Sequence, residues 1–247
     1  MSRDDAATTH FGFRTVGREE KTRLVRDVFD SVARNYDLMN DLMSGGLHRP
    51  WKSAFVRRAA PRAGEVFLDV AGGTGDIAFR IAKAGASVVV ADINAAMVGV
   101  GRDRAIDRNA EGDIRWSVGN AEKLPFADRS FDGVTVAFGL RNMTDIPAAL
   151  AEMRRVLEIG GRFLCLEFSR PLAALEPAYD FYSFKILPAI GNVVADDEEA
   201  YRYLAESIRR FPDKEPLRKL MIAAGFERVS YESLAGGICA IHIGWRL

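Results

Sequence analysis

The sequence has few cysteines, few histidines and no excess of either charge. Cys165 and Cys239 are the two cysteines in 247 residues, and neither has the CxxC or Cys/His spacing of a metal or redox site. Both lie in apolar stretches, so we expect buried, reduced thiols. Lys plus Arg and Asp plus Glu each number 34, and this balance argues against nucleic acid as the main ligand. The three histidines are scattered, which argues against a bound metal.

Long apolar segments are also absent from the sequence. No run approaches the roughly 18 residues that a transmembrane helix requires. The N-terminus, Met1–Asp5, is acidic and has no apolar segment of the kind found in a signal peptide. It is not an Arg-rich, acid-poor transit sequence either. We therefore expect a cytoplasmic protein.

Strand and helix patterns alternate over the middle of the chain. Hydrophobic residues make up 48% and charged residues 28% of the sequence, an ordinary composition for one globular domain. From Glu65 onwards, short apolar runs are followed by segments with helical spacing, which predicts an α/β fold whose mostly parallel sheet is covered on both faces. The expected strands are 66–70, 87–92, 114–118, 133–137 and 162–167, and the expected helices include 77–84, one ending near 109, and 146–157.

The end of the chain departs from this alternation. Residues 172–212 are an aromatic-rich helical stretch without a strand pattern, and a helix at 217–224 follows. Two successive strand patterns, 226–233 and 237–245, flank a Gly-Gly turn and suggest an antiparallel pair that finishes the sheet. This ending is typical of class I methyltransferases and unusual in dinucleotide-binding folds. We expect a Rossmann-like sheet of seven strands, mostly parallel, with an antiparallel C-terminal strand.

We expect the whole chain, 1–247, to form a single domain. Residues 1–17 show no period and are expected to be a tail that orders only when ligand binds, whereas 19–33 have helical spacing. The parts are 1–60, an N-terminal tail and helical lid; 61–171, the cofactor-binding core; 172–212, a helical insertion on the substrate side; and 213–247, the closing helix and strands.

A glycine-rich turn follows the first strand of the core. Asp69 precedes Gly73, Thr74 and Gly75, and glycines allow backbone amides to approach a ligand closely. Asp92 ends the next strand, where a carboxylate can accept both hydroxyls of a ribose. The same spacing satisfies the relaxed fingerprint of an NAD site, and a structural turn without a ligand is a further alternative.

Three features favour S-adenosylmethionine over NAD. Asp69 lies where methyltransferases place a carboxylate near the methionine part of the cofactor. The segment Gly119–Phe126 resembles the methyltransferase segment that holds the adenine. The closing pair of strands is the third feature.

Several segments outside this turn resemble one family of enzymes. They are Thr9–Phe13, Tyr36–Trp51, Phe138–Asn142, Arg155–Ser169 and Tyr201–Ile208. Together they cover nearly the whole chain, and they are similar to the ubiquinone/menaquinone biosynthesis C-methyltransferases, the UbiE family. The resemblance implies transfer of a methyl group from S-adenosylmethionine to a ring carbon of a polyprenylated benzoquinol or demethylmenaquinol, without a metal.

The resemblance also assigns cofactor contacts to residues of this chain. They are Thr74, Asp92, Asn120 and Ala121. Many members have a serine just before Phe-Gly-Leu, where this chain has Ala137, so that hydroxyl contact is missing.

Four residues are candidates for the chemical step. Arg141 and Asn142 follow the fourth strand, at the edge where open α/β sheets bind ligands. Arg141 could stabilise a developing phenolate, and Asn142 could orient the ring hydroxyl or a water. Asp37 or Asp41 could accept the proton, and His48 is a further candidate. The structural alternatives are an ion pair for Arg141, helix caps for the aspartates and a structural role for the histidine.

Partners follow from the resemblance as well. A lipid-tailed quinol implies transient contact with a membrane surface, peripheral at the inner membrane, although no polybasic cluster or lipidation motif is present. The aromatic stretch Tyr179–Leu187 is either core or the wall of a channel for the tail. A homodimer or a complex of quinone biosynthesis stays open. So do two other functions: a methyltransferase of the same fold acting on another phenolic or lipid, and a non-catalytic quinol-binding scaffold.

Overall fold

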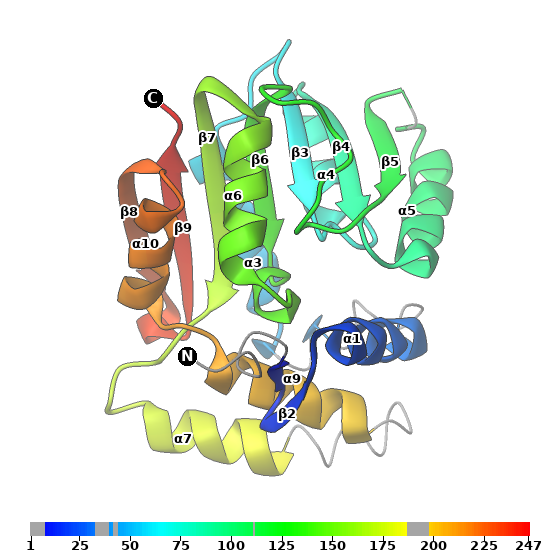
Figure 1. The fold of residues 1–247 in the computed structure, drawn as a ribbon. Coiled ribbons are helices and arrows are strands. Elements are labelled where there is room, and N and C mark those ends of the chain that lie inside the picture. The colour runs from blue at the N-terminus through cyan, green and yellow to red at the C-terminus, as the bar shows by residue number, and fades with distance from the viewer. Residues whose placement is uncertain (1–7, 33–39, 42–43, 111, 187–197) are drawn as a thin grey trace.

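The computed structural model describes residues 8–32, 40–41, 44–110, 112–186 and 198–247. A seven-stranded sheet forms its centre, in the order β5-β4-β3-β6-β7-β9-β8 (Figure 1). All neighbouring strands in this sheet are parallel except those that contact β9, which is antiparallel to β7 and β8. The prediction of a mostly parallel class I sheet is therefore confirmed. The strands are β3 (Val66–Val70), β4 (Ser87–Asp92), β5 (Ile114–Val118), β6 (Phe131–Ala137), β7 (Leu157–Phe168), β8 (Glu227–Leu234) and β9 (Cys239–Trp245).

Helices cover both faces of this sheet, so its central strands are apolar on both sides. One face packs against α3 (His48–Ala59) and α4 (Asp76–Lys83), whose Phe55 and Ile81 are fully buried. The other face packs against α6 (Ile146–Val156) and α10 (Lys214–Ala223), which bury Met153 and Met221. Helix α5 (Ala95–Asp107) lies at the β5 edge (Figure 1).

The N-terminal residues are more regular than their sequence predicts. Residues Thr8–Phe11 (β1) and Arg14–Gly17 (β2) pair as an antiparallel hairpin, and α1 follows at Arg18–Val32. The expectation of a tail without secondary structure is therefore wrong for residues 8–17. The Phe13 amide donates to Glu206 of a distant helix at 3.0 Å, so the hairpin is stabilised by tertiary contacts that its four-residue strands do not reveal.

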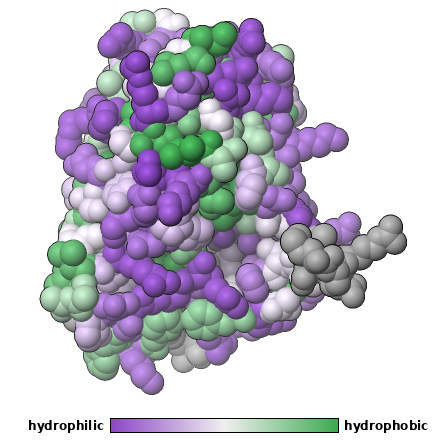
Figure 2. Space-filling model, turned by 60° about the vertical axis from the view of Figure 1, so that its left-hand side comes forward, coloured by the Kyte–Doolittle hydropathy of each residue, from purple (hydrophilic) through white to green (hydrophobic). Residues whose placement is uncertain are grey.

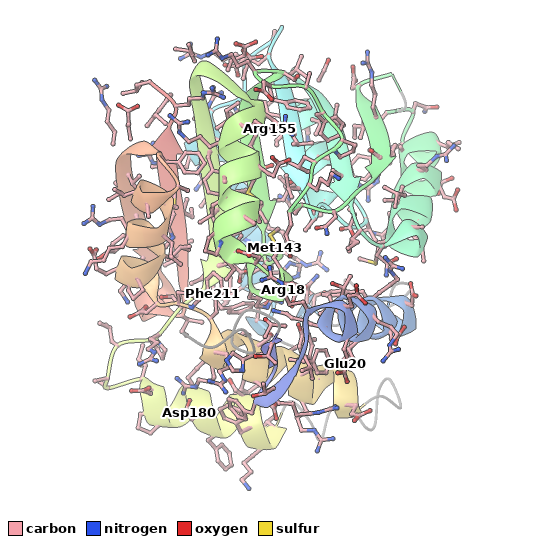
Figure 3. The ribbon with its side chains drawn as sticks, in the orientation of Figure 1. Arg18, Glu20, Met143, Arg155, Asp180 and Phe211 are labelled. Atoms are coloured by element: carbon pink, nitrogen blue, oxygen red, sulfur yellow. The ribbon has the colours of Figure 1, made fainter. Side chains whose placement is uncertain are left out.

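The hairpin, α1, α7 (Glu176–Phe181) and α9 (Glu198–Arg210) lie together beyond the carboxyl ends of the parallel strands (Figure 1), and we call them the lid. The described part of 172–212 is helical without a strand, as predicted, and includes a π-helical turn, Tyr182–Ile186. The lid is joined to the loop after β6. The Lys21 ammonium donates to the Met143 carbonyl at 2.7 Å, and Arg18 pairs with Asp145 at 2.6 Å; Arg18 and Met143 lie beside each other in Figure 3.

The surface carries both hydrophilic and hydrophobic side chains. Figure 2 shows hydrophilic residues over most of the face that it presents, with hydrophobic residues in separate patches. Within the described part of the chain, no helix has both the length and the apolar character needed to cross a membrane.

Gly133 and Gly99 provide a matched test of the packing. Gly133 lies opposite Phe67 across β3 and β6, and a Cβ there would come within 2.2 Å of the phenyl ring. Gly133→Ala is expected to lower the free energy of unfolding by about 1–3 kcal/mol. Gly99 lies in α5 with open space around it, so Gly99→Ala is expected to raise that free energy by about 0.5–1 kcal/mol. Urea unfolding measures both, and equal effects in the two variants would contradict the packing described.

Candidate active site

A pocket of about 790 Å³ opens between the carboxyl ends of the strands and helix α1. The loops after β3, β4, β5 and β6 form its sheet side, and α1 forms its cover. The pocket brings together five of the residues selected from the sequence: Gly73, Asp92, Asn120, Ala121 and Asn142. Its lid side is lined by Thr22, Val25, Arg26 and Phe29. Residues far apart in the sequence therefore build one site.

The turn after β3 depends on glycine. Gly75 has a φ of +84° and precedes α4, and a Cβ on it would lie 2.5 Å from the Trp116 ring. Neither the backbone conformation nor the space therefore suits a larger residue. The Gly75 amide donates to the Gly72 carbonyl at 2.9 Å, which closes the turn. Ala71 also has a positive φ of 51°, a strained conformation of the kind found at binding sites.

Asp92 joins this turn to the next loop. One carboxylate oxygen accepts a hydrogen bond from the Gly73 amide and the other from the Asn94 amide, both at 2.8 Å. The side chain is buried, and burial raises the pKa of Asp92 above its usual range while the backbone donors oppose the shift. The carboxylate thus lies in the pocket wall, where its position is set by backbone groups.

Asn94 was not selected from the sequence, yet it links the pocket to the lid. Its side-chain oxygen accepts from the Met97 amide at 2.9 Å and so caps α5. Its side-chain nitrogen donates to Asp30 of α1 at 2.8 Å. An asparagine directly before a helical pattern is an N-cap signal that could have identified the first role, whereas the contact with α1 depends on the tertiary fold.

Asp69 lies beneath the glycine turn and does not line the pocket. One oxygen accepts from the Thr135 hydroxyl at 2.8 Å, and the other is buried without a hydrogen-bond partner among the described residues. Burial raises the pKa of Asp69 to about 7. A Cβ on Gly72 would lie 2.7 Å from the unpartnered oxygen, so glycine at 72 leaves this carboxylate close to the loop.

The remaining predicted cofactor residues differ in their exposure to the pocket. Asn120 and Ala121 line it, and the Asn120 side chain accepts from the Glu122 amide at 2.9 Å. Thr74 is buried and does not line the pocket, and its hydroxyl accepts from Arg104 at 3.0 Å. Of the seven predicted cofactor residues, Gly73, Asp92, Asn120 and Ala121 line the pocket, whereas Asp69, Thr74 and Gly75 do not.

Arg141 and Asn142 have different surroundings although they are adjacent. Arg141 is buried, and its guanidinium pairs with Glu167 at 3.1 Å and donates to the Phe138 carbonyl. Burial raises the pKa of Glu167, and the Arg141 charge opposes this. Arg141 thus makes the ion pair that was its structural alternative, and it lines a second cavity between the lid and α6. Asn142 lines the main pocket, and its side-chain oxygen accepts from the Tyr203 hydroxyl at 2.9 Å.

Asp41 is engaged with two partners outside the pocket wall. It accepts from His48 at 2.8 Å and from Arg49 at 2.6 Å. The Arg49 guanidinium holds the pKa of Asp41 well below its usual range. The other ring nitrogen of the buried His48 has no partner among the described residues. Asp37 lies outside the described residues.

The described residues contain no group of three or more His, Cys, Asp or Glu side chains arranged to hold a metal ion. The polar residues that line the pocket include Asp92, Asn120 and Asn142, whose carboxylate and amide groups suit the hydroxyls of a ribose and the edge of an adenine. The close glycine turn and the unpartnered Asp69 oxygen fit a ligand that has both an uncharged polar end and a cationic end. The site therefore suits S-adenosylmethionine.

Comparison with known proteins agrees with this geometry. The model of the ubiE/COQ5 methyltransferase family matches residues 14–246. A protein of Acidiphilium cryptum (strain JF-5), named ubiquinone/menaquinone biosynthesis C-methyltransferase UbiE, is 56% identical over 249 residues, with 100% of both chains covered. A protein of the same name from Dinoroseobacter shibae (strain DSM 16493 / NCIMB 14021 / DFL 12) is 52% identical over 250 residues, again with 100% of both covered.

The fold is shared more widely. A SAM-dependent methyltransferase from Thermotoga maritima superposes with a TM-score of 0.65 at 19% identity, covering 90% of this chain and 99% of that chain. At this identity the likeness shows the fold alone. It supports the class I arrangement of the sheet and says nothing about the substrate.

Asp69→Asn is expected to change how stability depends on pH. The folded-state pKa is raised to about 7, whereas an unfolded aspartate titrates near about 3.9. The contribution of this group to stability is therefore fully present below about pH 3.9 and is lost as the pH rises through about 7. Because asparagine does not ionise, the stability of the variant relative to the parent should rise between about pH 4 and about pH 7 and stay level above that. Urea unfolding of the ligand-free proteins measures this, and a constant difference across that range would contradict it.

Proposed function

Since the chain belongs to the ubiE/COQ5 methyltransferase family and is an S-adenosylmethionine-dependent C-methyltransferase, we propose that its acceptor is a polyprenylated benzoquinol, a demethylmenaquinol or both. The observation that carries the proposal is the extent of the family match. Residues 14–246 include the cofactor pocket and all of the lid except β1 (Thr8–Phe11).

The chemistry needs a nucleophilic carbon and a well-aligned methyl group. A ring carbon beside a phenolic oxygen is electron-rich, and loss of the phenolic proton increases its nucleophilicity. When bound, the sulfonium of S-adenosylmethionine supplies the electrophilic methyl. The protein therefore has to position the two reactants, exclude water and accept a proton.

We assign the cofactor to the pocket under α1. In this assignment Asp92 accepts hydrogen bonds from the ribose hydroxyls, and Asn120 and Ala121 contact the adenine. Asp69 lies near the methionine end. Gly73 and Gly75, with Thr74 between them, allow the loop to approach the ligand. Support comes from the shared pocket wall and from the two backbone hydrogen bonds that fix the Asp92 carboxylate.

Asn142 and Arg141 have separate roles in this proposal. Asn142 lines the pocket and contacts an oxygen of the quinol ring. Arg141 lies buried beside it, paired with Glu167 and bonded to the Phe138 carbonyl. From there it holds the loop that carries Asn142, and its positive charge favours a phenolate that develops nearby.

We propose that the proton leaves through the Asp41–His48 pair. A carboxylate whose pKa is held low by Arg49 is a weak proton acceptor, but it can orient an imidazole. Asp41 accepts from one ring nitrogen of His48, and in this proposal the proton goes to the other, which is buried without a partner among the described residues. Asp37, outside the described residues, stays a prediction for the same task.

Because the acceptor carries a lipid tail, we propose that the protein contacts a membrane surface transiently. It would then be a cytoplasmic protein that binds peripherally to the membrane. Phe181, in the aromatic stretch of the lid, is 62% exposed and so is not a core residue. A homodimer or a complex of quinone biosynthesis stays a prediction.

Methyl transfer from labelled S-adenosylmethionine tests the proposed substrates directly. Short-tailed benzoquinone and naphthoquinone precursors are incubated in parallel with the enzyme, the cofactor and a reductant. We expect a methylated product from one precursor or both, and the pattern shows which pathway the enzyme serves. Intact cofactor binding without product from either precursor would overturn the proposed acceptor.

Asp92→Ala is expected to weaken S-adenosylmethionine binding by about tenfold to hundredfold, because it removes a charged acceptor from the pocket wall. Asp103→Ala is the matched control: it removes an exposed carboxylate from α5, away from the pocket wall. Isothermal titration calorimetry measures both affinities. If the two variants bind equally well, Asp92 is not a cofactor ligand.

Arg141→Ala is expected to lower the free energy of unfolding by about 3–5 kcal/mol, because it leaves the buried Glu167 carboxylate without its partner. Turnover should fall far more than cofactor affinity. A second change, Glu167→Gln, should restore part of the stability but not the turnover. Unchanged stability in Arg141→Ala would contradict the buried ion pair, and unchanged turnover would exclude Arg141 from the reaction.

A further inference from the structure

One hydrogen bond connects the lid directly to a pocket residue. Asn142 ends the short helix η2 (Leu140–Asn142) that follows β6, and its side chain lies in the pocket wall. The hydroxyl of Tyr203, on lid helix α9, donates to its side-chain oxygen at 2.9 Å. The two residues are separated by 61 positions in the sequence, so the bond depends on how the lid docks.

Tyr203 is firmly held. It is 3% exposed, and the ring of Phe11 from the hairpin stacks on it with centroids 4.0 Å apart and planes 12° from parallel. Burial raises the pKa of the Tyr203 phenol above its usual range, so the hydroxyl keeps its proton at neutral pH. It can therefore donate, and the structure places the side-chain oxygen of Asn142 opposite it.

This hydrogen bond fixes the orientation of the Asn142 side-chain amide. With its oxygen bonded to Tyr203, its NH₂ group has no acceptor among the described residues. Asn142 is half-buried in the pocket wall, so this NH₂ group is the end of the amide that a bound molecule can reach. A donor at this point suits an oxygen on the substrate, above all one that becomes negatively charged.

We infer that Tyr203 is a positioning residue that fixes Asn142 as a hydrogen-bond donor toward the ring oxygen beside the methylated carbon. The inference rests on the proposed function, because it takes the acceptor to be a quinol. Without the Tyr203 hydroxyl the amide can rotate and present its own oxygen, which repels a phenolate. The lid thereby contributes to the electrostatics of the site although Tyr203 does not line the cofactor pocket.

Tyr203→Phe tests this inference because it retains the ring that stacks on Phe11 and removes only the hydroxyl. We expect kcat for the quinol to fall about tenfold, with unchanged affinity for S-adenosylmethionine and an unchanged pH profile. Ser207→Ala is the matched control on the same helix. Among the described residues its buried hydroxyl bonds within α9, to the Leu204 carbonyl, and its removal should leave kcat unchanged.

A double-mutant cycle separates positioning from a general effect on the lid. In an Asn142→Ala background the amide is gone, so Tyr203→Phe should cause no further loss of kcat. Equal losses in both backgrounds, or full activity of Tyr203→Phe, would overturn the inference. If the parent enzyme binds S-adenosylmethionine but methylates neither quinol, the proposed function is wrong. If the parent is active and the two substitutions lower kcat independently, the proposed function holds and only the role of Tyr203 is wrong.

Discussion

The carboxylate of Asp92 is the point on which the site depends. It accepts hydrogen bonds from the amides of Gly73 and Asn94, and so joins the turn after β3 to the loop after β4. Asn94 extends the same connection to Asp30 of α1. Sheet, pocket and cover are thus linked through three consecutive hydrogen bonds. A parallel sheet brings its strand ends to one edge, but these bonds determine where the loops at that edge lie.

The lid contributes the remaining contacts that position the site. Lys21 and Arg18 bind α1 to the loop after β6, and Tyr203 binds α9 to Asn142 in the same loop. Beneath that loop, Arg141 and Glu167 form a buried ion pair whose charges are compensated by each other and by nearby backbone groups. One short segment therefore receives contacts from lid helices α1 and α9 and from the core, which suits the place where acceptor and cofactor meet.

The sequence predicts the sheet well because its strands are apolar runs between clear turn signals. Strands β3, β4 and β5 begin and end at the predicted residues. The sequence does not predict the hairpin, because β1 and β2 have four residues each, without a clear apolar run, and depend on distant contacts. The pocket residues on the glycine turn and at Asp92 follow from local motifs. The Tyr203–Asn142 bond and the burial of Arg141 do not, because both arise only when segments far apart in the chain pack together.

The proposed position of Asn142 determines which atom of the acceptor receives the methyl group. NMR of the quinol product formed with S-adenosylmethionine labelled with ¹³C in the methyl group identifies that atom most directly. We predict a labelled methyl on a ring carbon, because a fixed donor at Asn142 occupies the neighbouring oxygen and leaves the adjacent carbon to attack. A labelled methoxy group, formed on the phenolic oxygen, would contradict the arrangement described.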